Sequence, residues 1–383
     1  MNNFEFYCPT KVVFGKDTHE TVASNIKKFG GSRVLLHYGS QSAVKSGLID
    51  KIKSYLKADN IDFMELGGVL PNPRLSMVYE GIKLCKSHKL DFVLAVGGGS
   101  VIDSAKAIAL GATADCDVWD FFLRKSDPTT ALPVGCILTI AAAGSETSLS
   151  AVIKNDDENT KRGILTDLNR PKFAIMNPEL TYSVPKYHIA CGVVDILMHT
   201  LDRYFTNAKD TDFTDRISEA LMQSVLVKGR LTVEQPTNYE ARANIMWAGS
   251  VTHNTLTGLG KPLDFSVHAL ERGVSGKYDT AHGAGLAVLW GHWARYVYQD
   301  NVEQFTQYAN RVFGVDTALE GIEKTVDFFK SIDMPTTFKE LGVEDADIDE
   351  IAASATMAGK VKVGTFKPLD IEEVKIILKN ARG

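Results

Sequence analysis

The pattern of hydrophobic and polar positions divides the chain near its middle. In the first half, short apolar runs alternate with segments of helical periodicity, such as residues 48–56 and 77–88. Alternation of this kind is typical of βαβ units that form a mainly parallel sheet. The strands that it predicts are residues 7–14, 33–38, 63–66, 92–96, 134–140 and 173–176.

The second half of the chain has a different pattern. From about residue 185, long segments of 3.6-residue periodicity follow one another, separated by breaks that contain Gly or Pro, and none has the pattern of a strand. A chain of 383 residues also exceeds the usual size of one hydrophobic core. We therefore predict an α/β domain with a mainly parallel sheet over residues 1–184 and an all-helical domain over residues 185–383.

The composition argues against several classes of partner. The formal net charge is -5 and no basic block occurs, which speaks against binding to nucleic acid or to an anionic membrane surface. The first residues lack the pattern of a signal peptide, and no run of about 18 uncharged apolar residues occurs, so we expect a cytoplasmic protein. The five cysteines are widely spread, and we interpret them as buried thiols.

Three consecutive glycines, Gly97, Gly98 and Gly99, follow a predicted strand and precede Ser100 and a helix whose first turn carries Asp103. Glycines at such a turn let backbone N–H groups approach a phosphate, and the helix N-terminus favours its negative charge. The spacing differs from the G-x-G-x-x-G fingerprint of an ordinary Rossmann domain. A tight turn that needs positive φ is the alternative. Because three glycines exceed what one turn needs, we predict a phosphate-binding loop.

A second segment of small residues, 138–148, follows the next predicted strand and includes Thr139 and Ser148. In an open α/β sheet, ligands bind outside the carboxyl ends of neighbouring strands. Two loops placed in this way are suited to hold one extended dinucleotide.

The end of the 33–38 strand bears on which dinucleotide binds. The strand continues into Gly39, Ser40 and other neutral residues, and no acid occurs before Asp50. An enzyme selective for NAD usually offers an acid to the ribose hydroxyl, whereas one selective for NADP omits it. We therefore predict a preference for NADP(H) over NAD(H), with a loop that is neutral for unrelated reasons as the alternative.

An acid and a histidine lie four residues apart in the apolar stretch 192–201. If this stretch is helical, Asp195 and His199 share one face, one turn apart. Buried ionised groups need a partner, which is either each other, in a plain hydrogen bond, or a bound cation. Farther along, His268 and His282 lie fourteen residues apart, and His282 opens a new helix rich in Gly and Ala. One carboxylate with three imidazoles suits Fe²⁺ or Zn²⁺, and the lack of thiolates fits a catalytic metal site. The other histidines of this half are interpreted as ordinary surface or core residues: His188, His253 and His292.

Together with the turn Gly144-Ser145-Glu146, these motifs resemble the iron-containing, or group III, alcohol dehydrogenase family, and within it the branch of butanol dehydrogenases and broad aldehyde reductases. The likeness covers essentially the whole chain. It implies a dehydroquinate synthase-like fold, with a dinucleotide-binding first domain and a metal-binding catalytic second domain. It also implies hydride transfer between NAD(P)(H) and a small primary alcohol or aldehyde, with the metal as Lewis acid, in a homodimer or larger assembly.

The resemblance also assigns residues by matching position. It implies metal binding and catalysis by Asp195, His199, His268 and His282. It implies cofactor contacts at Gly39, Ser40, Asn72, Gly98, Gly99, Ser100, Asp103, Thr139, Ser148 and Lys161, of which Asn72 and Lys161 rest on the resemblance alone.

Other functions compete with this one. A glycerol dehydrogenase or a dehydroquinate synthase shares the fold and the glycine loop but uses a different metal set, and a hydroxy-acid or semialdehyde dehydrogenase differs only in substrate. A nucleotide-binding protein without catalysis is a further alternative. The presence of four candidate ligands argues against the first and the last.

One position departs from the family pattern. Many members have a histidine one turn beyond the second ligand histidine, where this chain has Arg272. A guanidinium stays protonated and cannot relay a proton. Arg272 either pairs with a nearby acid, such as Glu271 or Asp264, which is the simpler expectation, or faces the pocket and binds an anionic group of the substrate, such as the carboxylate of a semialdehyde.

Overall fold

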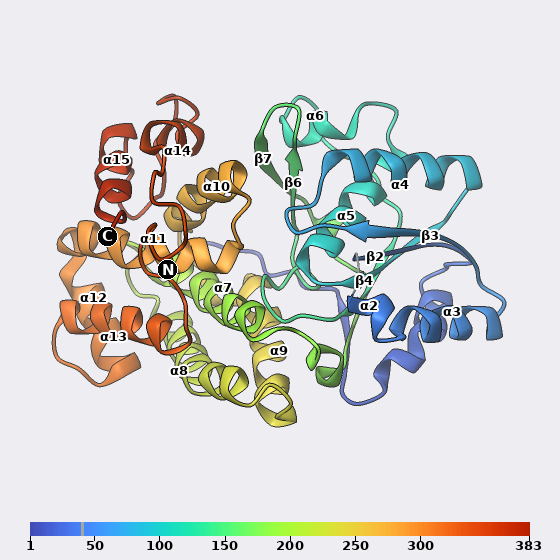
Figure 1. Ribbon diagram of the computed structural model, residues 1–383, viewed down its shortest axis with the longest axis horizontal. Helices are drawn as coiled ribbons and strands as arrows, with labels where there is room; N and C mark the ends of the chain where they lie inside the picture. The colour runs from blue at the N-terminus through green and yellow to red at the C-terminus, as the bar shows by residue number, and fades with distance from the viewer. Residues whose placement is uncertain (40–41) are drawn as a thin grey trace. The chain divides into compact units, whose positions relative to one another are not determined.

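The computed structural model describes residues 1–39 and 42–383. The chain forms two compact units, which Figure 1 shows in blue to green and in green to red. One unit comprises Tyr7–Val184, and the other comprises Met1–Phe6 together with Pro185–Gly383. No helix among the described residues is both long enough and apolar enough to span a membrane.

The first unit is built on a six-stranded sheet in the order β1-β8-β5-β4-β2-β3, in which every pairing is parallel. The predicted mainly parallel sheet is therefore confirmed. The central strand β4 is buried over its whole length, which explains its uninterrupted apolar sequence. The strands are β1 Lys11–Phe14, β2 Arg33–Gly39, β3 Asp62–Val69, β4 Phe92–Gly97, β5 Val134–Leu138 and β8 Phe173–Met176.

Helices cover both faces of this sheet. In Figure 1, α2 and α3 lie on one side of the strands and α4 and α5 on the other. The chain runs from β2 outward to β3 and then returns to β4 on the opposite side of β2, so the strand order reverses between β2 and β4. Ligands of open α/β sheets bind at such a point. The helices are α1 Val22–Lys28, α2 Ser42–Lys45, α3 Leu48–Ala58, α4 Leu75–His88, α5 Gly99–Thr113 and α6 Val118–Phe122.

An antiparallel strand pair that we did not predict follows β5. It consists of β6 Ser150–Asn155 and β7 Thr160–Leu165. The sequence of β7, TKRGIL, is polar and only partly buried, so it lacks the apolar run by which we identified the other strands.

The second unit is helical, as predicted, and is organised around α7. Every residue of α7 from Ile189 to Tyr204 is buried, and the helix packs against α8, α9 and α11. This environment explains why α7 is apolar around most of its circumference. The helices are α7 Lys186–Tyr204, α8 Asp212–Glu234, α9 Tyr239–His253, α10 Ser266–Tyr278, α11 His282–Val297, α12 Val302–Tyr308, α13 Ala318–Ser331, α14 Ile348–Ala355 and α15 Ile371–Asn380. The shorter helical turns of the chain are η1 Thr18–Thr21, η2 Asp167–Asn169, η3 Pro178–Thr181, η4 Leu256–Gly258, η5 Tyr298–Asn301 and η6 Ala309–Phe313.

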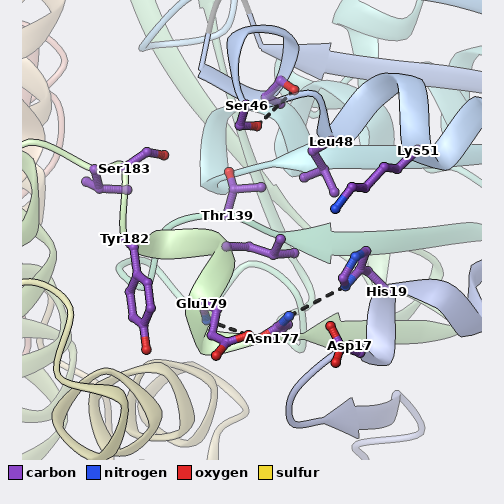
Figure 2. Close-up of a pocket in the computed structure, with 13 residues that line it drawn as sticks. Asp17, His19, Ser46, Leu48, Lys51, Thr139, Asn177, Glu179, Tyr182 and Ser183 are labelled. Atoms are coloured by element: carbon purple, nitrogen blue, oxygen red, sulfur yellow. Dashed lines mark hydrogen bonds between the residues drawn. The ribbon is translucent and has the colours of Figure 1, made fainter.

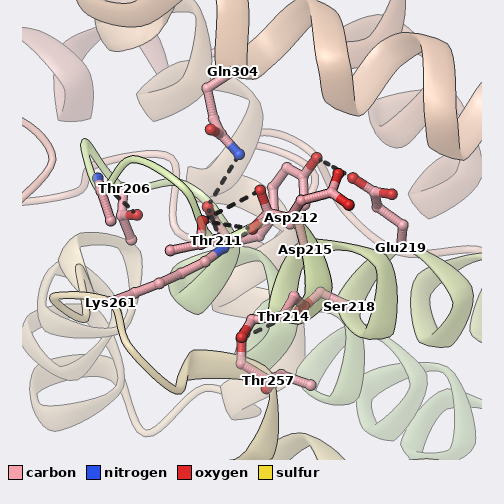
Figure 3. Close-up of polar contacts among 12 residues, drawn as sticks. Thr206, Thr211, Asp212, Thr214, Asp215, Ser218, Glu219, Thr257, Lys261 and Gln304 are labelled. Carbon is pink, nitrogen blue, oxygen red and sulfur yellow. Dashed lines mark hydrogen bonds and ion pairs between the residues drawn. The ribbon is translucent and has the colours of Figure 1, made fainter. Parts of the chain in front are cut away.

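A buried polar network fastens the end of α7 to α8 (Figure 3). Lys261 forms an ion pair with Asp215, and both side chains are almost fully buried. The hydroxyl of Tyr204 donates to Glu219 Oε1 at 2.7 Å. Because each buried charge has a partner of opposite sign or a hydrogen-bond donor, the network secures this helix junction without leaving a charge uncompensated.

The domain boundary differs from the predicted one at the N-terminus. We placed residues 1–184 in the first domain, but Met1–Phe6 belong to the helical unit. The amino group of Met1 donates to the carbonyl of Lys209 at 2.9 Å, and the N–H of Asn2 donates to the carbonyl of Gly260 at 2.9 Å. These contacts join segments far apart in the sequence, which periodicity does not reveal.

Candidate functional site

Helix α7 presents three polar side chains from an otherwise apolar core helix. Asp195, His199 and Asp202 follow one another at spacings of about one turn, so they share a face. All three are buried. Polar groups that are retained in such a position need partners, and those partners come from α10 and α11.

The side chains of α10 and α11 converge on the carboxylate of Asp195. Its Oδ1 atom lies 3.4 Å from His199 Nε2, 3.7 Å from His268 Nε2 and 3.7 Å from His282 Nε2. Asp195, His268 and His282 each offer one ligand atom within 4.8 Å of the others. The structure thus brings together the four residues selected from the sequence around Asp195 Oδ1.

Two atoms at this point fit a metal ion. Asp195 Oδ1 and His268 Nε2 are buried and form no hydrogen bond with any described residue. Such atoms are costly to leave unsatisfied. Ligand atoms at about 2.1 Å from one tetrahedral ion lie about 3.4 Å apart, which is close to the separations around Asp195. The donor set, one carboxylate and imidazole nitrogens without sulfur, suits Fe²⁺ or Zn²⁺.

Two further carboxylates form hydrogen bonds with the Nδ1 atoms of His268 and His282, on the side of each ring away from Asp195. Asp202 Oδ2 lies 2.5 Å from His268 Nδ1, and Glu271 Oε2 is hydrogen-bonded to His282 Nδ1. Both acids are fully buried. Since a carboxylate only accepts, each Nδ1 carries the proton and each Nε2 presents its lone pair toward Asp195. Sequence reasoning missed this role for both acids.

His199 is held differently from the other two histidines. The group that faces its Nδ1 atom, at 3.4 Å, is the guanidinium of Arg203, which also donates to the carbonyl of His199 at 2.5 Å. The ring of His253 lies with its centroid 4.1 Å from that of His199. Our interpretation of His253 as an ordinary histidine therefore overlooked its place beside the candidate ligands.

The local electrostatics differ between the histidines. Burial, followed by the neighbouring His253 and His268, holds the pKa of His199 well below its usual value, so this imidazole is neutral and keeps a lone pair for a metal. Burial alone would lower the pKa of His268, but Asp202 and Asp195 together raise it. The carboxylates of Asp202 and Asp195 thus favour positive charge at His268. A metal cation bound to His268 would supply such a charge.

Arg272 lies on α10 one turn beyond His268 and is partly buried. Burial lowers its pKa, whereas the charges of Glu271 and Asp202 act in the opposite direction. Among the described residues, its guanidinium has no hydrogen bond and no ion pair. The simpler expectation, an ion pair with Glu271 or Asp264, is therefore wrong for this structure. Glu271 instead accepts from His282, and Asp264 accepts from backbone N–H groups.

The glycine loop of the first unit joins β4 to α5. None of Gly97, Gly98 and Gly99 has positive φ, so the alternative of a turn that needs left-handed backbone is wrong. The requirement for glycine comes instead from the close packing of neighbouring side chains. A Cβ atom on Gly98 would lie 2.2 Å from Ile140, whereas one on Gly99 would meet only Ala143, at 3.4 Å. Helix α5 begins at Gly99, and Ser100 follows in its first turn, where N–H groups have no partner within the helix.

Asp103 and Lys106 hold the second loop against this helix. Asp103 accepts from Ser145 Oγ at 2.6 Å and from the N–H of Val152 at 2.9 Å. Lys106 is fully buried and donates to oxygens of Ser145, Ser148 and Ser150 at 2.7 to 3.2 Å. Burial lowers the pKa of Lys106 to about 8. The side chains of Asp103 and Ser148, chosen as cofactor contacts, are thus engaged in shaping the loop.

The remaining cofactor candidates lie on the same unit. Gly39 ends β2, and Lys161 lies on β7. Burial raises the pKa of Asp103, and the charge of Lys161 is among the effects that oppose this rise. Asn72 is buried and has a φ of 56°. The N–H of Thr139 donates to the carbonyl of Gly97 at 3.0 Å, which ties the two loops together. Ser40 lies outside the described residues.

A cavity of about 330 Å³ opens beside Thr139 (Figure 2). It is lined by Asn177 and Glu179 after β8, by His19 of η1, and by Ser46 and Lys51 near α3. The cavity lies at the carboxyl ends of β5 and β8, whereas we predicted an extended ligand at the loops that follow β4 and β5. Thr139, a predicted cofactor contact, is common to both places.

The whole chain matches known proteins. The family model described as "Iron-containing alcohol dehydrogenase" matches residues 9–178, and "Fe-containing alcohol dehydrogenase family, C-terminal" matches residues 189–382. The chain is 39% identical to NADH-dependent butanol dehydrogenase A of Clostridium acetobutylicum, with 100% of both chains covered. It is 31% identical to the NADPH-dependent aldehyde reductase YqhD of Escherichia coli, again with 100% of both covered. The crystal structure of NADH-dependent butanol dehydrogenase A from Thermotoga maritima has a TM-score of 0.97 and 36% identity, and the match covers 100% of this chain and 99% of that one.

Proposed function

Since the chain belongs to the iron-containing alcohol dehydrogenase family and is an NAD(P)-dependent enzyme of its butanol dehydrogenase and aldehyde reductase branch, we propose that its activity depends on one divalent metal ion, Fe²⁺ or Zn²⁺. The proposed ligands are Asp195, His199, His268 and His282. The substrate is a small primary alcohol or aldehyde, such as butanol or butanal.

One observation carries this proposal. Asp195 Oδ1 and His268 Nε2 are buried without hydrogen bonds from described residues, and three imidazole Nε2 atoms approach that same oxygen. A plain hydrogen bond between Asp195 and one histidine would leave the Nε2 atoms of the other two histidines without a partner among the described residues. A cation bound at this place would be coordinated by Asp195 Oδ1 and by all three Nε2 atoms.

The parts of the site have separate tasks. A metal held there supplies a Lewis acid for the alcohol or aldehyde oxygen, and a bound nicotinamide supplies or accepts the hydride. Asp202 and Glu271 keep the protons of His268 and His282 on Nδ1, so that each Nε2 points inward. The burial of Asp195, His199 and His268 keeps water from competing for these groups.

The nucleotide unit holds the cofactor in this proposal. The N-terminus of α5 and the glycines before it receive the diphosphate, and Asp103 with Lys106 keeps the neighbouring loop in place. We propose NADP(H) in preference to NAD(H), because the chain offers no acid from Gly39 to Ser42. The names of its relatives include both an NADH-dependent and an NADPH-dependent enzyme, so the preference needs a direct test.

Gly39→Asp provides that test. A Cβ atom at Gly39 would meet Val101 at 3.7 Å, which is ordinary contact, so the fold has room for the change. A carboxylate there should repel the 2′-phosphate and move the kcat/KM ratio toward NADH. The preference for NADP(H) is refuted if the wild type has the higher kcat/KM with NADH, or if Gly39→Asp leaves the ratio unchanged.

Metal dependence is tested by removing and restoring the ion. Protein freed of metal by a chelator under anaerobic conditions should remain folded and lose butanal reduction with NADPH. Titration with Fe²⁺ or Zn²⁺ should restore turnover in parallel with the binding of one ion per chain. Full turnover by protein that contains no metal would exclude the proposal.

A further inference from the structure

Arg272 is placed by its helix beside the candidate metal ligands. On α10, residues 268 and 272 are one turn apart and therefore share a face. Side chains on a helix lean toward its N-terminus, so the arginine lies over the turn that carries His268. The influence of Asp202, which is hydrogen-bonded to His268, on Arg272 agrees with this position.

The acids near Arg272 bind other groups, although Asp202 Oδ1 is buried without a hydrogen bond from a described residue. Glu271 accepts from His282, and Asp202 accepts from His268. Asp264 Oδ1 accepts from the N–H groups of Thr365 and Phe366 at 2.8 Å, and its Oδ2 accepts from Ser266. No acid among the described residues lies within ion-pair distance of the guanidinium, which offers five N–H donors in a planar fork.

There is space beside this face of α10. Gly276 lies one turn beyond Arg272 and is buried, yet a Cβ atom added there would meet no described atom within 4 Å. The opposite side of the helix is different, because Gly273 packs closely against Ile351 of α14 and Lys277 pairs with Asp347 and Glu350. The 268–272–276 face is therefore the one on which a ligand has room.

The negative charges of Glu271 and Asp202 act on Arg272, but neither carboxylate forms an ion pair with it. Its N–H donors are therefore not used by any described acid. The guanidinium fork matches a carboxylate, which it binds through two parallel hydrogen bonds. A carboxylate of the substrate is a partner that fits this fork.

We propose that Arg272 binds an anionic group at the far end of the substrate, so that the preferred substrates are aldehydes with a distal carboxylate and the corresponding hydroxy acids. This inference rests on the proposed function, because it assigns a substrate class to the same metal site. It makes Arg272 a residue that determines specificity.

The test compares two aldehydes of four carbons that differ only at the far end, succinic semialdehyde and butanal. The wild type should have the higher kcat/KM for succinic semialdehyde. Arg272→Gln should lower that value about 100-fold, as expected for a lost charged pair, and leave butanal within about threefold. Arg272→Lys keeps the charge and should recover part of the loss.

A binding measurement compares the affinities of the two product classes without any contribution from turnover. Without nucleotide, 4-hydroxybutyrate should bind the metal-loaded wild type more tightly than 1-butanol does, and Arg272→Gln should abolish the difference. Lys277→Gln is the matched control, because it removes a positive charge from the same helix on the side that faces α14, and it should leave both ratios unchanged.

The outcomes separate this inference from the proposed function. A wild type that favours butanal, with a ratio that Arg272→Gln does not change, overturns the role of Arg272 but leaves the alcohol dehydrogenase activity intact. Equal losses for both aldehydes in Arg272→Gln, or an equal effect of Lys277→Gln, also overturn it. Absence of turnover with either aldehyde in the metal-loaded wild type would instead count against the proposed function.

Discussion

At the scale of single residues, Asp202 and Glu271 decide how the imidazoles of His268 and His282 are presented. Each acid is buried and bound to an Nδ1 atom, which fixes both the tautomer and the orientation of the ring. A negative charge behind a ligand histidine also strengthens its bond to a cation. In the proposed metal site, affinity should therefore depend on residues that are not themselves ligands.

Asp202→Asn tests this dependence. The amide oxygen is still able to accept from His268 Nδ1, but the negative charge is lost, so we expect metal affinity to fall about 10- to 100-fold with little change in fold. Competition with a chromophoric chelator measures the affinity. The exposed Asp349→Asn serves as the control, since its partner Lys375 is remote in sequence from the candidate ligands. Equal affinities in Asp202→Asn and the wild type would contradict this role.

The residues of the candidate metal site were only partly predictable from the sequence. Asp195 and His199 were found because a pair at helical spacing in an apolar run needs a partner. Asp202 continues the same face and could have been found by extending that argument by one turn. The pairing of Glu271 with His282 depends on how α10 packs against α11, which no local pattern reveals.

At the scale of secondary structure, a buried histidine links three elements of the nucleotide unit. His37 of β2 donates from Nδ1 to the carbonyl of Leu66 in β3 at 2.8 Å, and its Nε2 accepts from Ser104 of α5 at 2.9 Å. Burial lowers the pKa of His37 to about 4. The folded unit thus keeps this imidazole neutral at pH values where the unfolded chain binds a proton.

We expect acid to destabilise the protein through His37. Its pKa is 6.5 when unfolded and about 4 when folded, so the unfolded state binds more protons between these values and stability falls as the pH decreases through them. From pH 7 to pH 5 the wild type should lose about 2 kcal/mol more than His37→Gln, which does not titrate. Urea unfolding at both pH values measures this. The exposed His88→Gln should behave as the wild type does, and a His37→Gln variant with the same pH dependence as the wild type would contradict the expectation.

Two neighbouring glycines at the start of α5, Gly98 and Gly99, allow effects on packing to be distinguished from effects on ligand binding. Gly98→Ala should destabilise the fold, because its Cβ atom would overlap Ile140 at 2.2 Å. Gly99→Ala should fold with nearly unchanged stability but bind NADPH at least about tenfold more weakly, since the methyl group would narrow the space toward Ala143, beside the N–H groups that we expect to bind a phosphate. Thermal unfolding and fluorescence titration with NADPH measure the two effects. Unchanged affinity in Gly99→Ala would argue against phosphate binding at this loop.

The elements themselves were predicted where periodicity is strong. The parallel strands and long helices carry apolar patterns that survive in any tertiary context. The β6–β7 pair was missed because its second strand is polar, and Lys106 was not selected because nothing local indicates that a lysine is buried among loop oxygens. Both omissions concern structure that is stabilised by contacts distant in sequence.

At the scale of the whole molecule, the sheet ends in an edge strand suited to pairing with a second chain. β1 pairs only with β8 among the described residues, and both its last residue, Phe14, and the preceding Tyr7 are exposed. Unpaired edges of this kind promote association. We therefore propose a homodimer in which β1 pairs across the interface.

Val12→Pro tests the dimer. The N–H groups of Lys11 and Gly15 donate to β8, and in a parallel ladder those of the alternate residues, Val12 and Phe14, point outward. Proline at position 12 removes one outward donor and leaves the bonds to β8 in place. We expect light scattering to report a dimer for the wild type and a monomer for the variant. A monomeric wild type, or a variant that remains dimeric, would contradict pairing through β1.

We propose that the alcohol dehydrogenase activity of this chain depends on a metal ion held by side chains of three helices. The most direct test is His268→Ala, analysed for metal content, NADPH binding and butanal reduction beside the wild type. We predict that the variant folds, binds NADPH, contains little or no metal and has no measurable turnover, because losing one ligand opens the site. Near wild-type turnover in metal-analysed His268→Ala protein would contradict the claim.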